Sequence, residues 1–515
     1  MLGFAVATFV AAAALSTHTA PDTYPVADTA TTSIATLQAA RGNLTVGSYS
    51  RFGWNHPGPL LYQILAGPYE LSGRREIALK WTALALNVAW LGGLLAVAGR
   101  RAPGLAVTIA VALVPLLWRE QRLLFSAWNP FVTVLALACG VAAAADLATG
   151  RAWRTRLGLT CLVVPLSFCV QAHVGLVVPS VVCVLTAAWG LARRATPGDA
   201  PTWPAIRSGL LIAAVVAAAL WLTPLVAEVR QRPGNLASLI EFLVRDAQPR
   251  GTWARAIAGA AYMTLGPFLP SWVVLYDEVP HDTPAWLPWT LALLIVGVIA
   301  ATVRAHRQGR RYETAFGAAC ALTSLAVVAA ARGVVGPLSD YLLLWATAIG
   351  ALDLAVVLAA LVPAVFDTSA STFVRAGGLA AVCAIAWAAV GGTRLIGKHA
   401  EQARDTTLRA LSTDLHAYCD RAHIARPLLA VVGDTAWQEA TGLVLQFDKA
   451  DRPIAVEDAA LYRVGRAFAR TGREDGTFLL MPTAGVALPA DAGRTEWITT
   501  RGAYRIVRLR VREGE

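Results

Sequence analysis

The chain has 515 residues, of which 56% are hydrophobic and only 15% are charged, and its mean hydropathy is +0.53. Soluble globular proteins carry about 25% charged residues, so this composition excludes an ordinary soluble enzyme. The net charge of +11 comes largely from arginines in short loops between apolar stretches. Such loops are typical of membrane orientation rather than of nucleic-acid binding. The sequence therefore predicts a polytopic membrane protein with no nucleic-acid partner.

Apolar stretches long enough to cross a bilayer as helices recur along the chain, and we expect about eleven spans in an all-α region. The first stretch is interpreted as a span, with a signal peptide as the alternative. Basic loops alternate along this series, which predicts a cytoplasmic N-terminus. A broken apolar segment around 254–276 is predicted to be a short embedded or interfacial helix. The spans are expected at 1–17, 76–99, 103–119, 130–148, 157–173, 174–192, 208–227, 284–304, 313–331, 341–363 and 375–393.

The composition changes near residue 397, which predicts two domains. Residues 1–397 would form a transmembrane catalytic domain whose first external loop covers 18–75, and 398–515 would form an extracytoplasmic soluble domain. In this tail a polar helical pattern precedes a short apolar run, a second helix and several strand-like segments. That order favours a small α/β domain. Its expected role is a lid or docking domain, with a second catalytic site as the alternative.

The polar segment Pro25–Leu60 lies between apolar runs and is the first place to look for a site. Ionisable side chains beside membrane spans are costly and usually functional or interfacial. On the predicted topology, a set of polar residues from distant parts of the chain maps to the external face, where a random scatter would divide between the two faces. These residues are Asp28, Asn55, His56, Trp128, Asn129, Gln171, His173 and Arg332.

Each of these residues also has a structural interpretation. Asp28 could cap a helix running to Ala40, and His56 could belong to the Pro57–Pro59 turn. His173, beside Gln171, could be a hydrogen-bonded histidine at a helix end. The other structural alternatives are the aromatic belt for Trp128, a helix cap for Asn129 and snorkelling for Arg332. Asp353, within an apolar span, is left without an assigned role.

A lone carboxylate with nearby amides and a cation suits general-base activation of a hydroxyl against a phosphate leaving group. The base would deprotonate the acceptor, while the cation stabilises charge on the departing phosphate. The histidines show no i, i+4 metal-binding pair, and six of the seven cysteines lie in apolar runs. No metal site is predicted, although the residues do not exclude a divalent metal.

These residues resemble the glycosyltransferase C superfamily, in particular its family 39-like branch of protein O-mannosyltransferases and lipid A aminoarabinose transferases. In that branch the first external loop opens with an acidic pair, followed by a His-Pro-Pro or Lys-Pro-Pro turn. Here Asp28-Thr29 is followed by His56-Pro57-Gly58, so a threonine replaces the second acid and a glycine the second proline. The strings YSRFGWNHPGPLLY, SAWNPF, QAHVG and the segment Trp221–Leu236 resemble a bacterial group of the same superfamily.

The resemblance implies a plasma-membrane enzyme that moves a sugar from a polyprenyl-phosphate donor to an acceptor hydroxyl on the external face, most simply with inversion. It implies Asp28 as catalytic base and His56 as a site residue. The other six residues would bind substrate, Arg332 near the phosphate. Thr29 puts a metal role that needs two acids in doubt. The acceptor (glycan, lipid or protein) stays open. The alternatives are a transporter or lipid flippase, and a non-catalytic scaffold. An Ala/Arg-rich, Lys-poor composition favours a bacterial origin.

Overall fold

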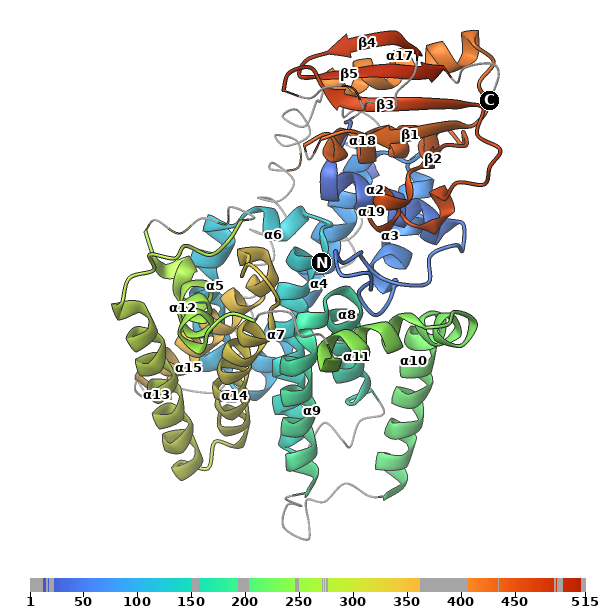
Figure 1. Cartoon of the computed structure of the whole chain (residues 1–515). Helices are drawn as coiled ribbons and strands as arrows, with labels where there is room; N and C mark the ends of the chain where they lie inside the picture. Colours follow the sequence, from blue (N-terminus) through green and yellow to red (C-terminus); the bar gives the residue numbers. More distant parts are fainter. Residues whose placement is uncertain are drawn as a thin grey trace. The chain divides into compact units, whose positions relative to one another are not determined.

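The structure, a computed structural model, describes most of the chain and divides into two compact units. Unit 1 comprises Met1–Asn55, Leu61–Thr82 and Arg394–Glu515, and unit 2 comprises His56–Leu60 and Ala83–Thr393. The predicted first loop, 18–75, is divided between the two units, since His56–Leu60 belong to unit 2 and the rest of the loop to unit 1. Apart from a few isolated positions, the described residues are 23–150, 157–192, 203–245, 250–270, 277–361, 406–433, 435–485 and 494–510 (Figure 1). The expected spans at 1–17 and 375–393 and the boundary at 397 lie outside them.

The tail in unit 1 contains a five-stranded sheet with the order β2-β1-β3-β5-β4. The β1 strand pairs in parallel with β2 and β3, while β5 pairs antiparallel with β3 and β4 (Figure 1). The predicted α/β tail is thus confirmed, although the sequence reading missed β4. The strands are β1 (Pro427–Val431), β2 (Ala455–Val456), β3 (Gly476–Pro482), β4 (Arg494–Arg501) and β5 (Tyr504–Arg510).

Three helices belong to this sheet: α17 (Thr406–Arg421), α18 (Trp437–Lys449) and α19 (Asp458–Val464). Parallel strands need a crossover connection, and α18 supplies it between β1 and β2. The strands alternate, so that Leu479 and Met481 join one apolar cluster. Phe478 instead meets Tyr418 of α17, with ring centroids 5.9 Å apart. The sheet is therefore buried through both faces, which explains its β-branched and aliphatic strands.

The first-loop helix α2 (Ala27–Ala40) packs against α18 of the tail. The approach is close, because a Cβ atom on Gly442 would lie 2.9 Å from the carbonyl oxygen of Pro25. Only glycine leaves room for the backbone there. Two further helices follow α2 along the chain: α3 (Leu60–Leu71) and α4 (Glu76–Arg101), each of which begins in one unit and continues in the other.

Charged groups join α18 to the first loop. The guanidinium of Arg41 binds the carboxylate of Asp448 and also lies 2.8 Å from Asp451 Oδ1. Arg74 Nη1 lies 2.7 Å from the other oxygen of Asp451. A further contact is partly buried, with Lys449 Nζ 3.3 Å from Glu76 Oε1. The tail and the first loop thus form one unit through ion pairs as well as apolar packing.

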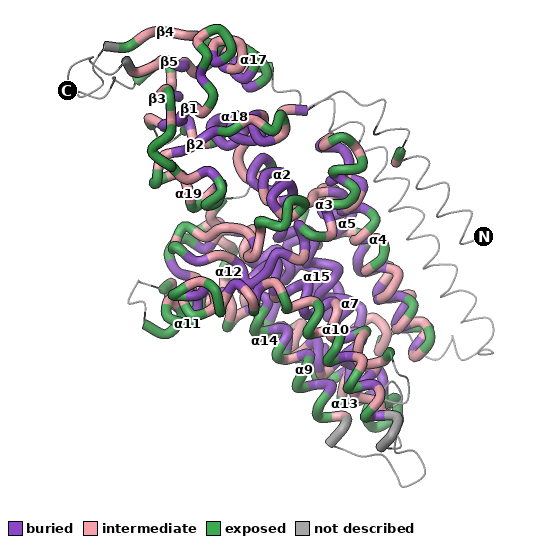
Figure 2. Tube along the Cα trace, turned by 90° about the vertical axis from the view of Figure 1, so that its right-hand side faces the viewer, coloured by how far each residue is buried: buried purple, intermediate pink, exposed green. Residues whose placement is uncertain are grey.

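Unit 2 is a helical bundle around α7 (Asn129–Ala148), almost every residue of which is buried. Its neighbours include α8 (Thr160–Ala172), α9 (Val177–Ala192), α14 (Arg311–Gly333) and α15 (Ala346–Leu361). Figure 2 shows α7 and α15 largely buried, whereas α10 and α13 carry many exposed residues. The remaining helices are α5 (Pro103–Arg119), α6 (Arg122–Phe125), α10 (Trp203–Arg230), α11 (Asn235–Arg245), α12 (Trp253–Leu265) and α13 (Trp286–Arg307), with 3-10 turns Val174–Leu176, Gly266–Phe268 and Asp340–Leu343.

Within the described ranges, five helices are long and apolar enough to cross a membrane: Glu76–Arg101, Asn129–Ala148, Ile206–Arg230, Trp286–Arg307 and Arg311–Gly333. Shorter apolar helices are Pro103–Arg119, Thr160–Ala172, Val174–Gly190 and Ala346–Leu361. All nine coincide with predicted spans, so a multi-pass membrane protein is supported. The total of eleven and the orientation stay predictions.

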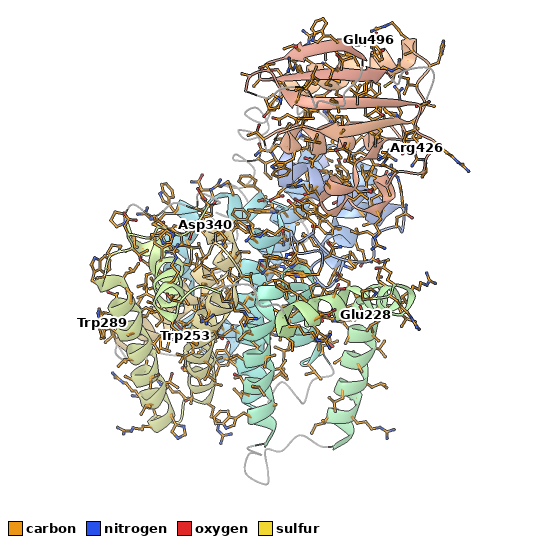
Figure 3. All side chains as sticks on the ribbon, in the orientation of Figure 1. Glu228, Trp253, Trp289, Asp340, Arg426 and Glu496 are labelled. Carbon is orange, nitrogen blue, oxygen red and sulfur yellow. The ribbon has the colours of Figure 1, made fainter. Side chains whose placement is uncertain are left out.

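Helix α11, which is not among the predicted elements, follows α10 through a tight connection. The Glu228 carboxylate accepts the backbone N–H groups of Leu236 at 2.7 Å and Ala237 at 3.0 Å, so it satisfies the first turn of α11. Figure 3 labels Glu228 near the end of α10. The apolar side chains of Ile240 and Val244 remain exposed on α11. This pattern is typical of a helix in a membrane interface.

Candidate functional site

Asp28 lies in the first turn of α2 and does not cap it. The N-cap residue is Val26, and the helix already begins at Ala27. The carboxylate of Asp28 is half-buried, and its Oδ1 accepts a hydrogen bond of 2.6 Å from the Tyr49 hydroxyl. Thr29, which occupies the place of the second acid in the resembling family, is exposed. The Asp28 side chain is therefore hydrogen-bonded to Tyr49 and does not cap the helix.

The surroundings of Asp28 combine burial with one positive charge. Burial raises the pKa of Asp28 above its ordinary value, while the Tyr49 hydrogen bond and the Arg463 charge partly oppose that rise. Burial also raises the pKa of Tyr49, and that of Tyr62 to about 12. Both phenols are therefore neutral at physiological pH. A carboxylate with a raised pKa is a better proton acceptor, which is the property that a general base needs.

In unit 2, His56 and His173 stack, with ring centroids 5.0 Å apart. The backbone N–H of Val174 donates to His56 Nδ1 at 3.1 Å, and that of Gly175 donates to His173 Nδ1 at 3.2 Å. Both rings thus accept hydrogen bonds from the irregular backbone between α8 and α9. Burial, with a smaller effect of His173, lowers the pKa of His56 well below its ordinary value. His56 is therefore a neutral acceptor in this structure.

Gln171 and Asn129 complete the same buried cluster. Gln171 Nε2 donates to the carbonyl of Leu220 on α10 at 2.9 Å, and Asn129 Nδ2 donates to the carbonyl of Ala172 at 2.9 Å. The backbone N–H of Gly58 donates to the carbonyl of Gln171 at 3.3 Å. A Cβ on Gly58 would lie 2.1 Å from Gln171 Oε1, so a larger residue there would displace the Gln171 side chain. The cluster thus fixes the Pro57–Pro59 turn against the end of α8.

Trp128 and Asn55 lie near these groups in sequence but make other contacts. Trp128 is the N-cap residue of α7, so Asn129 is not the cap. The Trp128 ring lies 5.3 Å from that of Tyr341, centroid to centroid. Asn55 pairs with Tyr49 through an isolated antiparallel bridge in unit 1. Asn55 therefore supports the backbone of the residue that binds Asp28.

Arg332 and Asp353 are placed on other helices of unit 2. The Arg332 guanidinium lies 5.5 Å from the centre of the Trp253 ring on α12, a cation–π contact, and Trp253 is labelled in Figure 3. Asp353 is fully buried, and Ser324 Oγ donates to it at 2.5 Å, which joins α15 to α14. The hydrogen bond of Asp353 therefore connects two helices of unit 2.

The structure thus brings His56, Asn129, Gln171 and His173 together and places Asp28 with Asn55 in unit 1. Sequence reasoning missed Tyr49 and Arg463. Tyr49 stands in the YSRFGWNHPGPLLY string that signalled the loop, whereas Arg463 stands in a tail with no motif. Among the residues that the structure describes, no group of three or more His, Cys, Asp or Glu side chains could hold a metal ion.

Among the comparisons with known proteins, only the one with solved structures finds a similar protein. No family model and no curated protein matches the chain. Among solved structures, apo ArnT from Cupriavidus metallidurans aligns over 99% of this chain and 98% of its own, with a TM-score of 0.56 and 16% identity. The chain has the fold of ArnT. The structure of ArnT bound to undecaprenyl phosphate aligns over the same shares, with a TM-score of 0.51 and 15% identity.

The ArnT fold covers both units, including the tail. ArnT is an aminoarabinose transferase of the glycosyltransferase C family, so the predicted resemblance is confirmed at the level of the fold. The matching strings of the sequence covered only about the first half of the chain, whereas the structural match extends over 99% of it. The α/β tail is therefore part of the shared architecture.

Proposed function

We propose that the chain is a membrane glycosyltransferase that moves a sugar from a polyprenyl-phosphate donor to an acceptor hydroxyl on the external face. The observation that carries this proposal is the ArnT fold over nearly the whole chain, together with a half-buried carboxylate at Asp28. The ArnT relative with bound undecaprenyl phosphate supports the donor class. A multi-pass apolar region supports a lipid-linked substrate, because such a lipid needs a bilayer.

In the proposed reaction, Asp28 acts as the general base. Its Oδ1 stays bonded to Tyr49, and its Oδ2 accepts the proton of the acceptor hydroxyl. The acceptor oxygen forms a bond to the anomeric carbon, the bond from that carbon to the phosphate oxygen breaks, and polyprenyl phosphate leaves. A single displacement of this kind inverts the configuration. Arg332 is the cation proposed for the phosphate, and its stacking on Trp253 would hold the guanidinium in place.

The buried imidazole cluster supports a positioning role for His56 better than a catalytic one. His56 Nδ1 is engaged by a backbone N–H, and the ring is only 9% exposed. We propose that His56, Asn129, Gln171 and His173 fix the Pro57–Pro59 turn against the end of α8 within unit 2. Buried backbone groups need such partners, because an unpaired polar group away from water is costly.

The test compares Asp28→Asn with the wild-type protein in detergent. The substrates are a panel of undecaprenyl-phosphate-linked sugars, and the measurement is release of undecaprenyl phosphate in the presence of cell-envelope extract. We expect Asp28→Asn to lose at least 100-fold of the activity, as is common for loss of a general base (about 10²–10⁴-fold). The matched control is Asp282→Asn, because Asp282 is an exposed acid in unit 2.

Full activity of Asp28→Asn would contradict the assigned base. A transporter or flippase would release no undecaprenyl phosphate in detergent, because no two compartments exist there. If the wild-type protein consumes no sugar donor of the panel under conditions in which it binds undecaprenyl phosphate, transport becomes the better proposal.

A further inference from the structure

A chain of contacts runs from Asp28 to helix α19 of the tail. The Tyr49 hydroxyl donates to Asp28, and the Tyr49 ring meets the ring of Tyr462 edge-on, with centroids 5.6 Å apart and planes at 70°. Tyr462 lies near the end of α19. The phenol that binds the proposed base is thus held from its other side by a residue more than 400 positions away in sequence.

Arg463, the next residue, is held between two aromatic rings. Its Cζ lies 4.5 Å from the centre of the Tyr462 ring and 4.7 Å from the centre of the Trp437 ring on α18. Two cation–π contacts limit the freedom of a long side chain and replace part of its hydration. Arg463 therefore lies beside the ring that contacts Tyr49, and its positive charge partly offsets the rise that burial causes in the pKa of Asp28.

The helices that carry these residues are themselves fixed in unit 1. Both α18 and α19 pack against α2, which carries Asp28. The ion pairs of Asp448 and Lys449 with Arg41 and Glu76 hold the opposite end of α18. Trp437, at the start of α18, is therefore presented by a helix whose position relative to α2 is determined at both ends.

We infer that the tail is part of the catalytic centre, with Tyr462 as the positioning residue that orients Tyr49 and Arg463 as the positive charge held beside the Tyr462 ring. The inference deepens the proposed function and rests on the role of Asp28 as base. It gives the α/β tail a task in the reaction beyond that of a lid or docking domain.

The groups that shift the pKa of Asp28, or whose pKa Asp28 shifts, define the expected pH behaviour. They are Tyr49 of the first loop, Tyr62 of α3 and Arg463 of α19. Both phenols stay neutral in the physiological range, so Arg463 is the charged member of this set. Its removal raises the pKa of Asp28 further, because only burial and the Tyr49 hydrogen bond then act. A base works when deprotonated, so activity is then lost at a higher pH.

The experiment measures kcat/KM against pH for the full-length protein with an undecaprenyl-phosphate-linked sugar. We expect Arg463→Ala to move the acid limb upward by about one pH unit or less, and Arg463→Lys to restore part of that change. Tyr462→Leu should lower kcat at all pH values, because Tyr49 loses the ring that orients it. Binding of undecaprenyl phosphate, followed by native mass spectrometry, should match the wild type in all three variants.

The control is Arg466→Ala, which removes an exposed arginine three residues further along the tail. An unchanged acid limb in a folded Arg463→Ala protein, combined with an inactive Asp28→Asn protein, overturns the inference and leaves the proposed function standing. Full activity of Asp28→Asn overturns the proposed function itself. If Arg463→Ala does not fold, the test uses Arg463→Lys and Tyr462→Leu. The inference is then contradicted if both variants show the pH profile and the kcat of the wild type.

Discussion

The carboxylate of Asp448 on α18 is bound by the guanidinium of Arg41 just after α2, although 407 residues separate them in sequence. Gln38 Nε2 adds a hydrogen bond of 3.1 Å to the same carboxylate. The Asp448 side chain is only 8% exposed, whereas that of its neighbour Asp451 is 62% exposed. The two acids thus offer a matched pair for testing how the tail is attached to the first loop.

We predict that Arg41→Ala lowers the free energy of unfolding of unit 1 by about 1–2 kcal/mol, because it leaves the buried carboxylate of Asp448 without its charged partner. Partial exposure of Arg41 keeps the loss below that of a fully buried pair. The measurement is thermal unfolding in detergent. Asp451→Asn is the control and should cost less than about 1 kcal/mol, since exposed ion pairs contribute little. Equal losses for the two variants would show that burial of Asp448 does not matter.

Gly58→Ala should destabilise unit 2 by about 1–3 kcal/mol. The added methyl group would overlap the side chain of Gln171, which must then give up its hydrogen bond to Leu220. Gly67→Ala is the matched control, because a Cβ there meets nothing within 4 Å. Since alanine favours a helix interior, the control should be neutral or slightly stabilising. A Gly58→Ala protein as stable as Gly67→Ala would refute the close packing of the turn.

The buried imidazole of His56 should make the stability of the protein depend on pH. Its pKa is lowered by burial in the folded state, so protons bind more tightly to the unfolded chain. Stability should therefore be constant above the ordinary histidine pKa of about 6.5 and fall as the pH decreases below it. His56→Gln should flatten the His56 contribution, which thermal unfolding between pH 7.5 and about pH 5 would reveal against the wild type. An identical pH dependence in both proteins would contradict a buried neutral imidazole.

Glu228→Ala should weaken the start of α11 by about 1 kcal/mol, because two backbone N–H groups lose a charged acceptor. Hydrogen exchange of the amides of Leu236 and Ala237 would report the change directly. Glu241→Ala is the control: its ion pair with Arg245 is exposed and lies within α11, so the expected cost is below about 0.5 kcal/mol. Unchanged protection of Leu236 in Glu228→Ala would exclude the carboxylate as the cap.

The sequence predicted the helices of unit 2 well, and physical reasons explain where it failed. Helix α10 was expected at 208–227 and runs from Trp203 to Arg230, so apolar length alone located it. Helix α11 was missed because its apolar residues are spaced for one exposed face and do not form a continuous apolar run. The interpretation of Asn129 as a helix cap was wrong, because its side chain donates a hydrogen bond to the carbonyl of Ala172 at the end of α8.

For the candidate site, the sequence by itself determined which residues are chemically able to act: a carboxylate at Asp28, imidazoles at His56 and His173, and a cation at Arg332. Their residue types and their places beside apolar runs carry that information locally. Only the tertiary structure decided that Tyr49 binds Asp28 and that Tyr462 of the tail packs against Tyr49. Contacts between residues hundreds of positions apart depend on how α2, α18 and α19 pack, and no local pattern of side chains encodes that packing.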